Sequence, residues 1–124
     1  MQLKTNNIGK TFSGVNVLRN VDFDLKPGEV HALVGENGAG KSTFVKILSG
    51  VYTPTEGSIF LDDKNINITS PIVAQRNGVS LIHQEPQSFS HLSVAENIFM
   101  GHMDGSNLSR VKWQDINSKS NEIL

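Results

Sequence analysis

The chain has 124 residues, a formal net charge of −1 and no cysteine. This length suits one domain, and the balanced charge argues against a nucleic-acid binder that works through a basic face. The missing cysteines exclude disulfides, zinc thiolates and thiol catalysis. The first residues, MQLKTNNIGK, show no secretory signal, and no apolar run reaches the roughly 20 residues of a membrane span. We therefore expect no direct membrane insertion.

The first 34 residues predict strands. Residues 3–12 suit a strand, and residues 21–25 (VDFDL) alternate apolar and polar side chains, as half-buried strands do. Gly14 and residues 26–29 (KPGE) are typical of turns. Residues 30–34 (VHALV) predict a buried strand, which would make His31 a core histidine.

The next segments predict helices alternating with short strands. A helix over 42–49 would end at Gly50, and a second would begin at Ser70-Pro71 and end at Gly78. Ser93 and Glu96 form the pattern of a capping box, for a helix that runs to about Met100 before Gly101. The remaining expected segments are strands over 58–61 (SIFL) and 79–82 (VSLI), loops over 83–91 and at Gly105, and a weak helix over 109–124 that carries Val111.

This order of elements predicts the fold class. Strands come first, and strands and helices then alternate, which favours an α/β fold with an antiparallel β piece attached. No linker-like segment separates two domains.

One motif carries chemistry. The pattern G-x-x-x-x-G-K-[ST] is matched by Gly35-Glu36-Asn37-Gly38-Ala39-Gly40-Lys41-Ser42. Glycines let the backbone N–H groups approach phosphate oxygens, and the following helix points its positive end at the same place. Lys41 would contact the outer phosphates, and Ser42 would offer a hydroxyl to Mg²⁺, with Thr43 beside it. The alternative is a chance glycine-rich turn without function; the strand and helix expected on either side of the motif favour phosphate binding over it.

The motif predicts a bound nucleoside triphosphate with Mg²⁺. By itself it separates neither ATP from GTP nor hydrolysis from kinase chemistry. A GTPase would be expected to carry the base-specificity motif N-K-x-D, and this motif is absent from the sequence.

Longer stretches carry a resemblance to a known family. They are KTFSGVNVLRNVDFDLKPGEVHALVGENGAGKST (10–43), LSGVYTPTEGSIFLD (48–62), GVSLIHQE (78–85) and LSVAENIFMG (92–101). Through them the chain resembles the ATP-binding subunits of ABC transporters, and within these the ribose, galactose and xylose importers. The resemblance implies a P-loop NTPase core of the ABC ATPase type, with an antiparallel β subdomain and an incomplete domain. It implies the β subdomain and core over about 1–91 and the start of a helical subdomain over about 92–124.

The resemblance also implies residue roles. Phe12 matches the aromatic residue that stacks on adenine, and Val17 a position near the base or ribose. Gln84 matches the Q-loop glutamine, which reaches Mg²⁺ and the attacking water. The implied catalytic residues are thus Lys41 and Gln84, and the implied Mg²⁺ contacts are Ser42 and Gln84. Binding of ATP itself is implied for the set Phe12, Val17, Gly35, Asn37, Gly38, Ala39, Gly40, Lys41, Ser42 and Thr43.

Several features invite other interpretations. Residues 59–63 (IFLDD) imitate a Mg²⁺-binding acidic strand end, but their position predicts that Asp62 and Asp63 are turn residues. Residues 48–50 (LSG) imitate a signature motif but end a helix. His31, His83, His91 and His102 lack a ligand spacing, so we expect no metal bound through them.

The family's signature motif, catalytic glutamate and switch histidine are missing. The chain is therefore interpreted as an N-terminal piece of a transporter ATPase, which by itself binds nucleotide without efficient hydrolysis. An exposed sheet edge is expected to favour self-association of this piece. Expected partners of the parent are permease subunits and a second nucleotide-binding domain, on the inner face of the plasma membrane. Two alternatives to sugar import stay open: the import of another solute, and a soluble ABC module that takes no part in transport.

Overall fold

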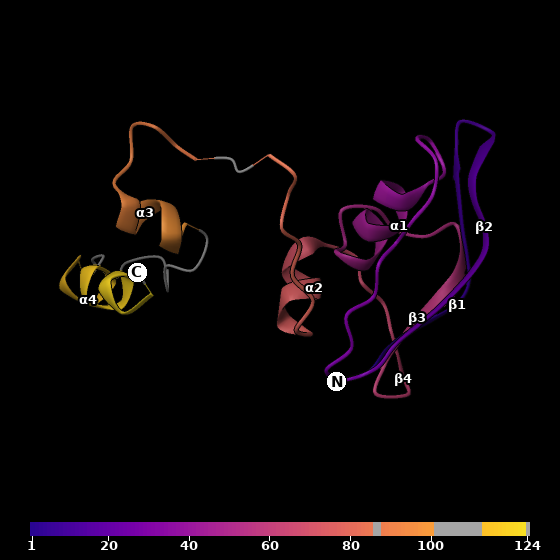
Figure 1. Ribbon diagram of the computed structural model, residues 1–124, viewed down its shortest axis with the longest axis horizontal. Helices are drawn as coiled ribbons and strands as arrows, with labels where there is room; N and C mark the ends of the chain where they lie inside the picture. The colour runs from indigo at the N-terminus through magenta and orange to yellow at the C-terminus, as the bar shows by residue number, and fades with distance from the viewer. Residues whose placement is uncertain (86–87, 101–112, 124) are drawn as a thin grey trace. The chain divides into compact units, whose positions relative to one another are not determined.

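The computed structural model describes residues 1–85, 88–100 and 113–123 (Figure 1). The chain divides into two compact units, Met1–Leu81 and Ile82–Leu124. The expectations for Gly101, His102, Gly105 and Val111 lie outside the described residues.

A four-stranded antiparallel sheet forms the first unit's framework, in the order β2-β1-β3-β4 (Figure 1). Strand β1 spans Leu3–Phe12 and forms a hairpin with β2, Val15–Leu25, through a turn in which Gly14 has a φ of 83°. On its other side, β1 pairs with β3, Glu56–Leu61, which in turn pairs with β4, Lys64–Ile66. This sheet confirms the expected antiparallel β piece. It also adds β4, which the sequence did not predict, and extends β2 beyond residues 21–25.

The β3–β4 turn decides the role of the acidic pair. Asp62 and Asp63 have φ angles of 46° and 62°, in the left-handed region where a tight turn places its residues. They connect two antiparallel strands, which confirms their assignment as turn residues.

Two helices of the first unit begin and end where the sequence predicts. Helix α1 spans Lys41–Leu48, and Gly50 follows it with a φ of 75°. Helix α2 spans Pro71–Arg76, and the Ser70 hydroxyl accepts a hydrogen bond from the Val73 N–H at 3.4 Å. The end of α1 lies close to the start of α2, since a Cβ atom on Gly50 would collide with the Ser70 carbonyl oxygen.

Helix α1 is fixed to one face of the sheet by the apolar core. Phe44 and Ile47 of α1 are buried, and Phe23 of β2 packs edge-on against Phe44 with ring centroids 5.5 Å apart. The buried cluster consists of Ile8, Leu18, Phe44, Ile47, Ile59, Ile68 and Ala74. Burial of such side chains contributes roughly 1.5–3 kcal/mol each, so the core holds α1 against the sheet.

Two predicted strands are absent, which corrects the sequence interpretation. Residues 30–34 and 79–82 have no regular secondary structure, and Val30, Val34 and Ile82 are 97%, 92% and 95% exposed. A strand exists only when another strand takes up its backbone hydrogen bonds. The four described strands pair with one another and leave none for these segments. His31 is correspondingly exposed rather than buried, with its Nδ1 3.4 Å from Glu29 Oε1.

These exposed valine and isoleucine side chains predict self-association of the 124-residue chain. Unpaired strand-forming segments offer backbone groups and apolar surface to other copies. Light scattering should give a mean mass that rises with concentration, and Val30→Lys with Ile82→Lys should lower it. Val15→Lys, on an exposed valine of the β1–β2 hairpin, is the matched control and should leave it unchanged. A monomer at high concentration would contradict the prediction.

The second unit contains helices α3, Val94–Phe99, and α4, Trp113–Ile123. The predicted capping box is confirmed: the Ser93 hydroxyl accepts from the Glu96 N–H at 3.3 Å, and Glu96 Oε2 accepts from the Ser93 N–H at 2.7 Å. Asn97 ties the preceding loop to α3, since its Oδ1 accepts from the Phe89 N–H at 2.7 Å. Across the described helices, none is both long enough and apolar enough to cross a membrane.

The capping box predicts a pH dependence for the start of α3. Hydrogen bonds from the Ser93 hydroxyl, and then from its backbone N–H, hold the pKa of Glu96 below its ordinary value. The capping box stabilises the start of α3 fully at pH values above the pKa that Glu96 has in the unfolded chain. This stabilisation is lost as the pH falls through the lowered pKa that Glu96 has in the folded chain. An NMR titration of the Glu96 carboxyl should show this, and Ser93→Ala should move the pKa back upward. Ser118→Ala, an exposed serine on α4, should leave the titration unchanged.

Candidate nucleotide-binding site

The P-loop, residues 35–42, lies at the start of α1. Gly38 and Gly40 have φ angles of 87° and 89°, and Gly40 is the N-cap of α1. The Phe44 N–H donates to the Gly40 carbonyl at 2.9 Å, which is the first hydrogen bond of the helix. The left-handed glycines turn the backbone sharply before α1, so the unpaired N–H groups of its first turn face the loop. This backbone can bind an anion.

Gly40 also presses against β2. A Cβ atom on it would lie 2.5 Å from Leu18 Cδ2 and 3.1 Å from the Val17 carbonyl oxygen. Real Cβ atoms essentially never come within 3.0 Å of another heavy atom, so a side chain at position 40 would have to displace the Leu18 side chain. The structure thus brings Val17 beside the P-loop, where the sequence interpretation placed it near the nucleotide.

Lys41 bridges the P-loop. Its Nζ donates to the carbonyl oxygens of Gly35 and Glu36, each at 2.7 Å. The ammonium group therefore lies inside the loop, against backbone that leads to the helix. Lys41 and Thr43 are half-buried, whereas Asn37, Ala39 and Ser42 are exposed. A phosphate group in the loop would meet one positive charge, bare backbone and accessible hydroxyls.

Phe12 lies at the end of β1, opposite Val15 of β2. Its ring packs edge-on against Tyr52, with centroids 5.2 Å apart and planes at 72°. Lys10 Nζ lies 5.0 Å from the Phe12 ring centroid. The sequence analysis missed Tyr52 and Lys10, because neither belongs to a motif. The only local signal is that Tyr52 follows closely on Gly50, the helix end.

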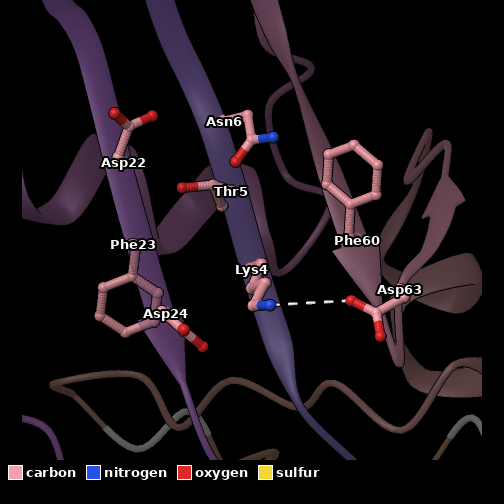
Figure 2. A pocket seen from close by; sticks show the side chains of 8 residues that line it. All are labelled: Lys4, Thr5, Asn6, Asp22, Phe23, Asp24, Phe60 and Asp63. Atoms are coloured by element: carbon pink, nitrogen blue, oxygen red, sulfur yellow. Dashed lines mark ion pairs between the residues drawn. The ribbon is translucent and has the colours of Figure 1, made fainter.

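A groove of about 640 Å³ lies elsewhere on the sheet (Figure 2). Its acidic residues already have partners. Asp63 forms an ion pair with Lys4 at 3.7 Å, Asp24 accepts from Gln2 Nε2 at 2.6 Å, and Asp22 accepts from the Asn7 N–H at 2.7 Å. The groove therefore consists of side chains that stabilise the strands, and the P-loop stays the candidate site.

Comparison with known proteins identifies the family. The ABC transporter family profile matches residues 18–124, which include the P-loop and α1. The chain belongs to the ABC transporter family. Binding of ATP is a property of this family, and the resemblance drawn from the sequence is confirmed.

Curated ABC relatives are ribose import proteins. The chain is 48% identical over 98% of its length to the ribose import ATP-binding protein RbsA 3 of Rhizobium etli. It is also 48% identical, again over 98% of its length, to the ribose import ATP-binding protein RbsA 1 of Agrobacterium fabrum. In both cases the chain spans 24% of the relative's length.

Solved structures show the same ABC fold. An ATP-binding cassette of an ABC transporter superposes with a TM-score of 0.80 at 27% identity, over 98% of this chain and 52% of the cassette. A nucleotide-free cassette superposes with a TM-score of 0.74 at 28% identity, over 96% of this chain and 46% of the other. The predicted fold class, an α/β cassette of the ABC ATPase type with an antiparallel β subdomain, is confirmed for the part that the chain covers.

Gln84, the last of the predicted site residues, lies in the second unit and is exposed. Ser42, with which it would share Mg²⁺, belongs to the first unit. The joint role of these two residues therefore stays a prediction. Within residues 1–85, 88–100 and 113–123, no cluster of three or more histidine, aspartate or glutamate side chains could hold a metal ion.

Proposed function

We propose that this chain is the ATP-binding portion of an ATPase subunit that energises sugar import through an ABC transporter. The observation that carries the proposal is the P-loop, with two left-handed glycines at the start of α1 and Lys41 inside it. The relatives named as ribose import proteins support sugar as the solute.

The P-loop residues suit a triphosphate in three ways. The bare backbone around Gly40 leaves N–H groups of the first helical turn for phosphate oxygens. Lys41 can move its hydrogen bonds from the Gly35 and Glu36 carbonyls to the phosphates, which adds charge to the contact. Ser42 is exposed and can turn its hydroxyl to a cation on the phosphates, with Thr43 beside it.

Mg²⁺, when bound, neutralises charge on the phosphates. Ser42 would hold it from the first unit, and Gln84 would hold it and orient the attacking water. Phe12 would stack on adenine through its ring face, since base stacking needs only a flat aromatic surface. Val17 would lie near the base or ribose.

Transport would require partners. The relatives are about four times as long as this chain, which spans 24% of their length. We infer that permease subunits and a second nucleotide-binding domain complete the transporter. The ATPase subunit would bind to the permease on the cytoplasmic side of the plasma membrane. The 124-residue chain alone would bind ATP without efficient hydrolysis, because no catalytic glutamate or opposing signature motif is present in its sequence.

Calorimetric titration with Mg²⁺ and ATP, paired with a steady-state phosphate-release assay, tests the proposal. The expected result is ATP binding without sustained turnover. Absence of binding would overturn the nucleotide role, and steady turnover that depends on Lys41 would overturn the claim of an inactive chain. Genes for a permease and a sugar-binding protein beside its gene would support import over a non-transport module.

A further inference from the structure

Tyr52 connects two parts of the proposed ATP site that are separate in the sequence. It lies in the segment between α1 and β3, and its half-buried ring contacts the Phe12 ring edge-on, 5.2 Å between centroids. An edge-to-face pair fixes the orientation of both rings and leaves at least one face of each ring free of the other ring. Tyr52 can therefore hold Phe12 and still leave one face of the Phe12 ring clear of Tyr52.

Tyr52 is itself anchored to the P-loop helix. Its backbone N–H donates to the Lys46 carbonyl of α1 at 3.1 Å, beside a 2.9 Å bond from the Val51 N–H to the same oxygen. Lys46 Nζ lies 5.6 Å from the Tyr52 ring centroid. Both backbone and ring are thus attached to the helix that begins at Lys41.

Lys10 completes the arrangement on the strand side. Its Nζ lies 5.0 Å from the Phe12 centroid and 6.0 Å from the Tyr52 centroid, and it donates to the Thr53 carbonyl at 2.7 Å. The segment that carries Tyr52 is therefore fixed to β1 as well as to α1. Rings held from two elements lose little freedom when a ligand binds, which favours binding.

We propose that Tyr52 is a positioning residue for the nucleotide base: it sets the Phe12 ring at a fixed place relative to the P-loop helix, without touching the nucleotide. This rests on the proposed function, in which Phe12 stacks on adenine. Because Tyr52 would influence only the contact with the base, it should change the affinity for ATP and not the affinity for a phosphate chain that lacks a base.

The test compares ATP with inorganic tripolyphosphate as ligands of the 124-residue chain, by calorimetric titration. Tyr52→Leu should weaken ATP binding about threefold to tenfold and leave tripolyphosphate binding unchanged, whereas Tyr52→Phe, which keeps the ring, should bind ATP normally. Phe60→Leu is the matched control, since it removes an aromatic ring of β3 that lines the separate groove, and it should change neither affinity.

A double-mutant cycle with Phe12→Leu shows whether Tyr52 acts through Phe12. The double variant should bind ATP no more weakly than Phe12→Leu alone. The positioning role would be overturned if the two substitutions weakened ATP binding additively. It would also be overturned if Tyr52→Leu weakened the binding of both ligands, or weakened neither. In each of these cases ATP binding by the wild type would still stand. If the wild-type chain bound no ATP, or Phe12→Leu bound it normally, the base platform and its positioning residue would both be overturned.

Discussion

Replacing Lys41 with alanine is expected to weaken ATP binding about 100-fold. The substitution removes the only positively charged side chain of residues 35–42, together with its hydrogen bonds to the Gly35 and Glu36 carbonyls. Hydrogen bonds to charged groups contribute about 1.5–3 kcal/mol each, and a hundredfold loss corresponds to about 2.8 kcal/mol. Calorimetric titration with ATP and Mg²⁺ measures the effect.

Two further variants separate charge from geometry. Lys41→Arg keeps the charge but replaces a compact ammonium with a planar fork, so binding should stay well below that of the wild type. Lys64→Ala removes an equal charge from the exposed edge strand β4 and should have no effect. Equal losses in Lys41→Ala and Lys64→Ala would mean that the chain attracts ATP only through its overall charge.

Replacing Gly40 with alanine should destabilise the first unit and impair ATP binding. The residue has a φ of 89°, where a side chain costs about 1–2 kcal/mol. The new Cβ would also lie 2.5 Å from Leu18 Cδ2, and overpacking of this kind costs typically 1–3 kcal/mol. In a domain of about 100 residues such a loss lowers the Tm by about 10 °C or more. Thermal unfolding followed by circular dichroism provides the measurement.

Gly14→Ala is the matched control for this substitution. Gly14 has a similar φ of 83°, but no heavy atom lies within 4 Å of the position of its Cβ. It should cost only the backbone strain, about 1–2 kcal/mol, and leave ATP binding intact. Equal destabilisation by the two substitutions would show that the contact with β2 contributes nothing.

The features predicted correctly from the sequence are local ones. Ser70 caps α2, Gly50 ends α1, and Ser93 forms a capping box with Glu96, as expected. Each of these depends on residues within about one helical turn, so a short stretch of sequence contains the whole interaction. The P-loop belongs to the same class, because its glycines, lysine and helix are contiguous.

The features that were missed depend on distant partners. Residues 30–34 have the composition of a buried strand, yet pairing is decided by other strands, and here no described strand pairs with them. Strand β4 has three residues, two of them polar, so only its pairing with β3 defines it. Tyr52 was missed for the same reason, since its partner Phe12 lies 40 positions earlier in the sequence.

The two glycines at the ends of α1 differ in whether a second mutation could compensate for their loss. At Gly40 the nearest obstacle is the side chain of Leu18, so a suppressor screen that starts from Gly40→Ala should recover shorter residues at position 18. At Gly50 the nearest obstacle is the main chain of Ser70, which no substitution can shorten. Position 40 can therefore change in evolution if position 18 changes with it, whereas position 50 permits glycine alone.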